Sequence, residues 1–71
     1  MKQKATFTEV LECELGKSAT IMCKSHDRKE LSNRVVWTSK VKTIEYSNDN
    51  IIGFETQNTK YELVDASTNR Q

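Results

Sequence analysis

Hydrophobic and polar residues alternate along most of the chain, and a period of two is typical of β-strands. The alternation predicts a half-buried strand over residues 6–15 and a second strand over residues 19–24. Because Gly16 lies in the break between them, we expect the two strands to form an antiparallel hairpin. The inner face of this hairpin takes the positions Phe7, Leu11, Cys13, Leu15, Ala19, Ile21 and Cys23.

Residues 25–33 interrupt the pattern with a polar connection in which Leu31 is the one apolar residue. This segment is too short and too polar to form a packed helix. We interpret it as a mobile loop. The alternative is a single helical turn, because Asp27 and Glu30 have a spacing like that of a capping box.

Strand character returns over residues 34–46, where Val35, Val36 and Trp37 favour an extended backbone. The alternation slips at residues 38–40, which predicts a bulge or a bend at that point.

Two further strands are predicted in the last third of the chain. Polar residues 47–50 predict a turn, because their short side chains tolerate a left-handed backbone. Residues 51–56 predict a strand, and Gly53 inside it marks a bend or a close backbone approach. A turn at residues 57–58 leads to a last strand over residues 60–64.

Five or six short antiparallel strands with no convincing helix predict an all-β fold. Closure would remove the free edges of so small a sheet, so we expect an SH3-like or OB-like barrel, with an open meander as the alternative. The chain of 71 residues allows one domain, which we place at residues 1–65, with a disordered tail at residues 66–71.

The net charge is +1, which does not indicate a nucleic-acid-binding protein, but the charge is unevenly placed. Residues 24–42 carry six basic and two acidic side chains. If nucleic acid is the ligand, we expect its phosphates to be bound by Arg28, Lys29, Arg34, Lys40 and Lys42. Trp37 joins this candidate site only if it is exposed, since a single tryptophan in an apolar run is usually a core residue.

The sequence contains no constellation that predicts catalysis or metal binding. We interpret Cys13 and Cys23 as buried thiols in a reducing cytoplasm, with a disulfide between them as the alternative. We expect His26, the one histidine, to be a solvated loop residue. The prediction is therefore no catalytic residue, no metal site and no cofactor.

The chain has no apolar run near the roughly 20 residues of a membrane-spanning helix, and no apolar stretch typical of a signal peptide. We therefore expect a cytoplasmic protein without a membrane partner.

The second half of the chain resembles small uncharacterised β proteins of Gram-positive bacteria and their mobile elements. In those proteins a Thr-Ser-x-Val segment precedes a hairpin of the form Glu-Thr-x-Asn-Ser/Thr-x-Tyr-x-Leu. Here the matching segments are residues 38–41 and 55–63. The resemblance implies a bacterial cytoplasm and an accessory role, and it assigns no functional residue.

These observations together predict a non-enzymatic binding or interaction protein. The expected partner is another protein or a second copy of the chain, since a small barrel can present an edge or a concave face to either. The alternative is a nucleic-acid-binding barrel that uses the basic segment 24–42.

Overall fold

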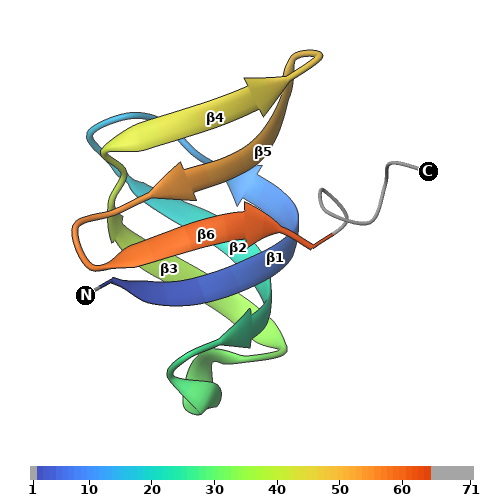
Figure 1. Ribbon diagram of the computed structural model, residues 1–71, viewed down its shortest axis with the longest axis vertical. Helices are drawn as coiled ribbons and strands as arrows, with labels where there is room; N and C mark the ends of the chain where they lie inside the picture. The colour runs from blue at the N-terminus through green and yellow to red at the C-terminus, as the bar shows by residue number, and fades with distance from the viewer. Residues whose placement is uncertain (1, 65–71) are drawn as a thin grey trace.

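The computed structural model describes residues 2–64, and in this part of the chain six strands enclose a hydrophobic core (Figure 1). The strands are β1 (Gln3–Glu12), β2 (Ser18–His26), β3 (Arg34–Lys40), β4 (Thr43–Ser47), β5 (Asn50–Glu55) and β6 (Thr59–Leu63). A short 3-10 helix, η1 (Lys29–Leu31), lies between β2 and β3. The all-β class predicted from the alternation is therefore confirmed.

All six strands belong to one sheet with the order β3-β2-β1-β6-β5-β4. Strands β1 to β3 form one antiparallel meander, and strands β4 to β6 form a second. The two meanders join where β1 and β6 run parallel. The expectation of antiparallel strands throughout is wrong for this central pair, because parallel strands need a long crossover and here the four intervening strands supply it.

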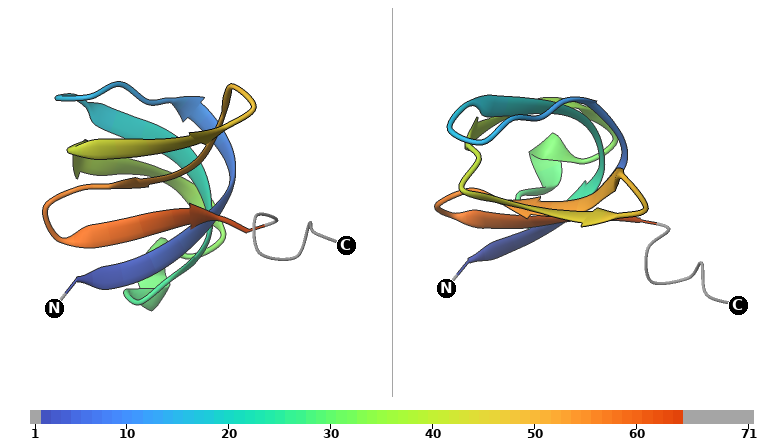
Figure 2. Two further views of the ribbon diagram at one scale, coloured as in Figure 1. Left: turned by 45° about the horizontal axis from the view of Figure 1, so that its top comes forward. Right: turned by 90° about the horizontal axis from the view of Figure 1, so that it is seen from above.

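The sheet curls strongly, so that its two halves face each other across the core (Figure 2). Strands β3 and β4 lie at the two ends of the strand order, and no ladder pairs them within residues 2–64, so the sheet is not a closed barrel. Val41 lies in the chain between β3 and β4 and bonds to the β1–β2 turn. Its N–H donates to the carbonyl of Lys17 over 2.9 Å, and its carbonyl accepts the N–H of Gly16 over 2.9 Å.

The core is built from apolar side chains of both meanders around three aromatic rings. The ring centroid of Phe54 lies 5.7 Å from that of Phe7 and 4.7 Å from that of Tyr61, with Tyr61 stacked at an interplanar angle of 17°. The other buried apolar residues are Ala5, Ala19, Ile21, Cys23, Val36 and Val41.

The inner face expected for the first hairpin is correct for β2 and only partly correct for β1. Phe7 is fully buried, but Leu11 and Leu15 are 54% and 62% exposed, and Cys13 is half-buried. The register of β1 against β2 shifts at three places, and after the shift between Phe7 and Glu9 the side chain that packs against the core is Val10 in place of Leu11. The strand also ends at Glu12, three residues before the predicted end.

The polar segment after β2 is a short 3-10 turn rather than an irregular loop, in agreement with the helical alternative. The capping box is absent, because the N-cap of η1 is Arg28 and its side chain makes no capping bond. Asp27 instead accepts the backbone N–H of Lys4 at its Oδ2 over 2.8 Å. The segment is therefore fastened to the start of β1.

The expected slip at residues 38–40 becomes a full break at residues 41–42, so the predicted strand over 34–46 is divided into β3 and β4. The turn predicted at residues 47–50 is confirmed, because Asn48 and Asp49 have φ angles of 52° and 67°. A Cβ at Gly53 would lie 3.1 Å from the carbonyl oxygen of Tyr61, so the predicted close backbone approach is also confirmed.

The predicted disordered tail at residues 66–71 lies outside the described residues. Within residues 2–64, no helix has the length and apolar character needed to cross a membrane.

Candidate functional site

Strand β3 is an edge strand. It pairs with β2 along one side, and within residues 2–64 no strand pairs with its other side. The free edge ends at Val41, whose backbone groups are bonded to the β1–β2 turn. Alternate residues of an antiparallel edge strand point their N–H and C=O groups outward, so β3 presents a short row of unpaired backbone donors and acceptors.

A groove of about 690 Å³ runs along this free edge, and every residue from 34 to 39 contributes to its lining. The lining also includes Gln3 and Asn58, which are joined by a 2.8 Å hydrogen bond from the N–H of Gln3 to the carbonyl of Asn58. The buried rings of His26 and Tyr61 contribute at its base. The groove thus combines an unpaired strand edge with polar side chains from β1, β2 and the β5–β6 turn.

Trp37 lies on this edge and is 73% exposed, the largest exposed fraction among the large hydrophobic side chains of residues 2–64. Trp37 therefore meets the condition set for its place in the candidate nucleic-acid site, and it is not the core residue that a single tryptophan usually is. Successive residues of a strand point to opposite faces, and Val36 takes the inward position, which turns Trp37 outward. The apolar run 35–37 did not reveal which of its residues points inward.

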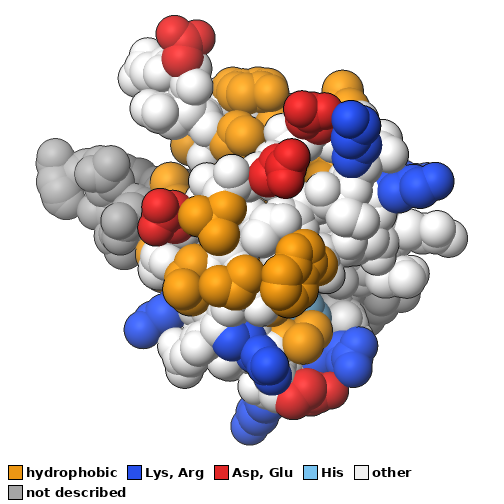
Figure 3. Space-filling model, turned by 180° about the vertical axis from the view of Figure 1, so that it is seen from behind, with side chains coloured by type: hydrophobic (Ala, Val, Ile, Leu, Met, Phe, Trp, Pro, Cys, Tyr) orange, Lys and Arg blue, Asp and Glu red, His pale blue; other side chains and the backbone are white. Residues whose placement is uncertain are grey.

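Trp37 belongs to an apolar surface on the outer face of β2 and β3. Met22 is 38% exposed and is the cross-strand partner of Val35, and Thr20 is the partner of Trp37. Hydrophobic side chains gather in the middle of the face seen from behind, with Lys and Arg side chains along its lower border (Figure 3). We call Met22, Val35 and Trp37 the outer apolar patch.

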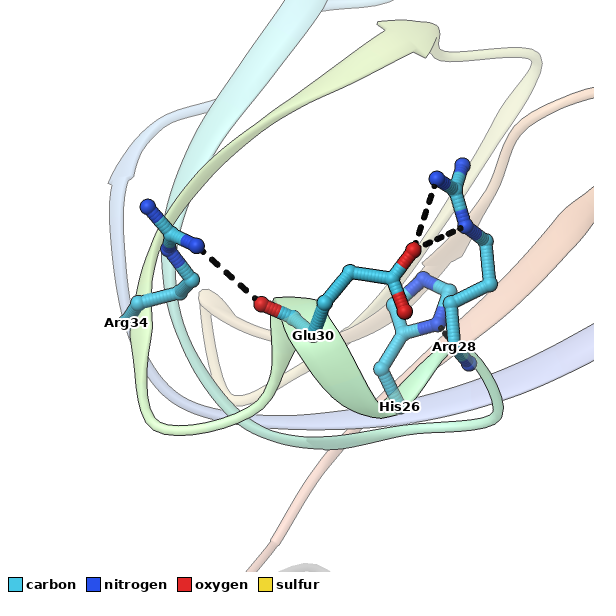
Figure 4. Close-up of polar contacts among 4 residues, drawn as sticks. All are labelled: His26, Arg28, Glu30 and Arg34. Atoms are coloured by element: carbon cyan, nitrogen blue, oxygen red, sulfur yellow. Dashed lines mark hydrogen bonds and ion pairs between the residues drawn. The ribbon is translucent and has the colours of Figure 1, made fainter.

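A set of hydrogen bonds holds η1 against the end of β2 and the start of β3 (Figure 4). The N–H of Arg28 donates to Nδ1 of His26 over 2.9 Å, and the Arg28 guanidinium binds the Glu30 carboxylate over 2.9 Å. Arg34 Nη1 donates to the backbone carbonyl of Glu30 over 3.1 Å. Arg28 is therefore neutralised by a carboxylate, whereas Arg34 contacts only a neutral group of the same turn.

His26 is 7% exposed, so the expectation of a solvated loop histidine is wrong. Burial lowers the pKa of its imidazole, and the nearby positive charge of Arg28 lowers that pKa further. Nδ1 accepts a hydrogen bond, which only a neutral ring can do on that nitrogen. His26 is thus an uncharged structural residue beneath the groove.

The structure places the basic residues predicted for nucleic acid at the two ends of β3. Arg28, Lys29 and Arg34 lie at the η1 end, and Lys40 and Lys42 lie at the Val41 end. At about 3.3 Å per residue, the Cα atoms of Arg34 and Lys40 are roughly 20 Å apart. Trp37 lies midway between the two groups.

Sequence reasoning missed several groove residues, namely Gln3, His26, Asn58, Thr59 and Tyr61. Tyr61 is 4% exposed, so it contributes to the core as well as to the groove. The others come from three separate segments, and their proximity depends on the parallel pairing of β1 with β6. No local sequence signal reports that pairing.

The described residues show no arrangement of groups suited to catalysis. Cys13 and Cys23 are free thiols, and burial raises the pKa of each, which keeps both protonated at neutral pH. Within residues 2–64, no three side chains of His, Cys, Asp or Glu come together as metal ligands.

A second groove, of about 790 Å³, lies between β1 and the β4–β5 hairpin and is lined by Val10, Ile51, Ile52 and Leu63 among others. Strands β1 and β5 pair with β6 only over residues 3–7 and 53–55, so the later part of β1 and the start of β5 each have one unpaired side beside this groove. It differs from the groove at β3 in its side chains, because its lining holds no basic residue and no exposed large hydrophobic side chain comparable with Trp37.

Comparisons with protein-family models, with curated proteins and with solved structures returned no significant match.

Proposed function

We propose that this chain is a small, non-enzymatic protein-interaction module that binds an extended segment of another protein along the free edge of β3. The observation that carries this proposal is the position of Trp37, exposed on an unpaired strand edge that borders a groove. An extended segment can add a strand to such an edge. Backbone hydrogen bonds then supply affinity, and contacts to alternate side chains supply specificity.

A nucleic-acid ligand is the second candidate, because an exposed aromatic ring beside basic side chains is typical of single-strand binding sites. The residues available to it are Arg28, Lys29, Arg34, Lys40 and Lys42, with Trp37 as the stacking ring. Two observations favour the protein segment. The basic residues lie in two groups at opposite ends of β3, and Arg28 is bound to Glu30.

The fold supports an interaction role in a further way. We propose that the curled sheet is related to SH3-like or OB-like small barrels, with β3 and β4 left unpaired where a barrel would close. The support is the bonding of Val41 to the β1–β2 turn. A cytoplasmic location and a bacterial origin stay predictions of the sequence.

The test begins with a random-peptide display library selected against the purified chain. Selected peptides are expected to perturb the backbone amide resonances of β3 and the fluorescence of Trp37, the one tryptophan of the chain. The matched variants are Trp37→Ala and Tyr46→Ala. Tyr46 is 60% exposed on β4, the other edge strand, so it controls for the loss of any exposed aromatic ring.

Loss of peptide binding in Trp37→Ala, with binding retained in Tyr46→Ala, supports the proposal. Peptides that perturb β4 or the second groove instead of β3 contradict it. A parallel titration with a single-stranded oligonucleotide tests the second candidate. Quenching of Trp37 that disappears as salt rises establishes nucleic-acid binding in place of peptide binding.

A further inference from the structure

We infer that the segment bound along β3 is acidic, with a carboxylate three positions to each side of a large apolar residue. This inference rests on the proposed function and names the chemistry of the partner. It follows from three properties of β3, which are the spacing of its charges, the direction of Trp37 and the absence of carboxylates on the strand.

The two charged residues of β3 stand at its ends. Arg34 and Lys40 each lie three positions from Trp37, and the strand contains no acidic residue. Side chains directly opposite each other on paired strands have Cβ atoms about 5 Å apart, so they contact one another. A segment with its central residue opposite Trp37 therefore places the residues about three positions to each side near Lys40 and Arg34, in either strand direction. The spacing is regular on the Arg34 side, and on the Lys40 side the register of β3 against β2 shifts between Trp37 and Lys40.

Both positive charges lack a carboxylate partner within residues 2–64. Arg34 donates to the backbone carbonyl of Glu30, which carries no charge, and Lys40 takes part in none of the ion pairs there. Arg28 differs, because Glu30 already neutralises it. The positive charges with which an added strand can pair are thus those at the two ends of β3, and they favour acidic residues at the facing positions of that strand.

The central position of the segment is apolar for a separate reason. Directly opposite residues of paired strands lie on the same face, so the residue opposite Trp37 joins the outer apolar patch. Figure 3 shows hydrophobic side chains gathered in the middle of the face seen from behind, with basic side chains along their lower border. A large apolar side chain beside Trp37 would extend the patch and cover part of it from water.

The charge of β3 also argues against a second copy of the chain as the occupant. Antiparallel pairing of two β3 strands about Trp37 would place Arg34 of each copy opposite Lys40 of the other, and like charges directly opposite each other are destabilising. Strand β4, the other free edge, has five residues and one carboxylate, Glu45, so it can match at most one end. A second copy fits this edge poorly.

The experiment compares three nine-residue synthetic peptides that differ only at positions −3 and +3 from a central leucine. These two positions hold Glu, Gln or Lys, and the peptides contain no aromatic residue, so Trp37 alone fluoresces. The Glu peptide is expected to bind most tightly. The Gln peptide is expected to bind more weakly by about 2- to 30-fold, the product of two cross-strand charge pairs. This difference should shrink as salt rises.

A charge exchange on the protein provides the decisive comparison. The variant Arg34→Glu/Lys40→Glu is expected to prefer the Lys peptide to the Glu peptide. The control variant Lys29→Glu/Lys42→Glu has the same net charge but is altered outside β3, and it should keep the preference for the Glu peptide. Arg34→Gln/Lys40→Gln, which introduces no new charge, should bind the Glu and Gln peptides with nearly equal affinity.

Equal affinity of the wild-type protein for the Glu and Gln peptides would overturn the inference, as would an unchanged preference in the charge-exchanged variant. Library peptides that bind β3 with basic or neutral ends overturn the inference and leave the proposed function standing. If no library peptide contacts β3, both fail. Dimers of the free protein with slow hydrogen exchange along the β3 edge would make a second copy the occupant and overturn the inference.

Discussion

At the scale of single residues, His26 determines how the end of β2 meets η1. Its backbone N–H donates to Ser32 Oγ over 3.1 Å, and its Nδ1 accepts the N–H of Arg28 over 2.9 Å. Its ring meets Tyr61 edge-on with centroids 6.0 Å apart. A protonated imidazole could not accept the bond from Arg28, so this arrangement requires the neutral ring.

We predict that the free energy of unfolding decreases as pH falls from about 7 to about 5. Burial lowers the pKa of His26 in the folded state below 6.5, so the unfolded chain binds more protons in this window. Stability is therefore fully present above pH 6.5 and is lost as pH falls through the lower folded pKa. The carboxyl groups of Glu30 and Glu55 have folded pKa values below 4.5, so their protonation affects the free energy of unfolding only at lower pH.

The measurement is an NMR titration of the one imidazole, together with urea unfolding at several pH values. His26→Gln should have a flatter stability profile between pH 5 and pH 7. A folded-state pKa of His26 at or above 6.5 would contradict the prediction.

Whether a residue points inward could be predicted from the sequence only where the alternation was regular. Ala19, Ile21 and Cys23 are buried as expected, since β2 keeps its period. Which of Val36 and Trp37 points inward could not be predicted, because both are strong strand formers and only one can take the inward position. His26 was assigned to a loop, although it is the last residue of β2.

At the scale of elements, the β4–β5 hairpin shows turn chemistry that follows directly from its residues. Ser47 pairs with Asn50, and the two residues between them both have a left-handed backbone. Positive φ at both central positions is typical of a type I′ turn, in which Asn-Gly is the favoured pair. Here the second position is Asp49, which carries a steric cost that glycine would not.

We predict that Asp49→Gly stabilises the protein by about 0.5–1 kcal/mol, because glycine adopts a φ of this kind without the clash of a Cβ. The measurement is the urea midpoint at constant m-value. Asn48→Ala should lower the midpoint, since alanine tolerates a left-handed backbone less well than asparagine. A lower midpoint for Asp49→Gly would show that the Asp49 side chain makes a compensating interaction.

The elements themselves were largely predictable, and their pairing was not. Turn residues and alternation locate four of the six strands to within a few residues, and the predicted strand over 34–46 covers the other two, β3 and β4. The parallel pairing of β1 with β6 joins residues more than fifty positions apart, so no local pattern reports it. The register shifts in β1 could not be predicted for a related reason, because a β-bulge does not require any particular residue type at its position.

At the scale of the whole molecule, Val41 joins the two ends of the curled sheet. It lies between β3 and β4 and is 2% exposed, and its backbone groups bond to Gly16 and Lys17 in the β1–β2 turn. The side chain therefore fills the core at the same point where the backbone bridges the gap. Loss of this side chain should loosen the contact between the two meanders as well as leave a cavity.

We predict that Val41→Ala lowers the free energy of unfolding by about 2 kcal/mol, and that the amides of Gly16 and of residue 41 exchange faster with solvent. Val35→Ala removes the same atoms from the half-buried outer apolar patch and should cost about half as much or less. Urea unfolding and amide hydrogen exchange measure both effects. Equal costs for the two variants would mean that Val41 has no special part in joining the meanders.

The parallel β1–β6 pair has a consequence for synthesis on the ribosome. Strand β1 emerges before the other strands of this sheet and can pair on one side with β2. Its other side stays unpaired until β6 has been synthesised. Non-local pairing of this kind slows folding, and an unpaired strand can associate with the wrong chain in the meantime. A nascent chain that stalls before residue 59 would expose the side of β1 that β6 covers, as well as the rings of Phe7 and Phe54.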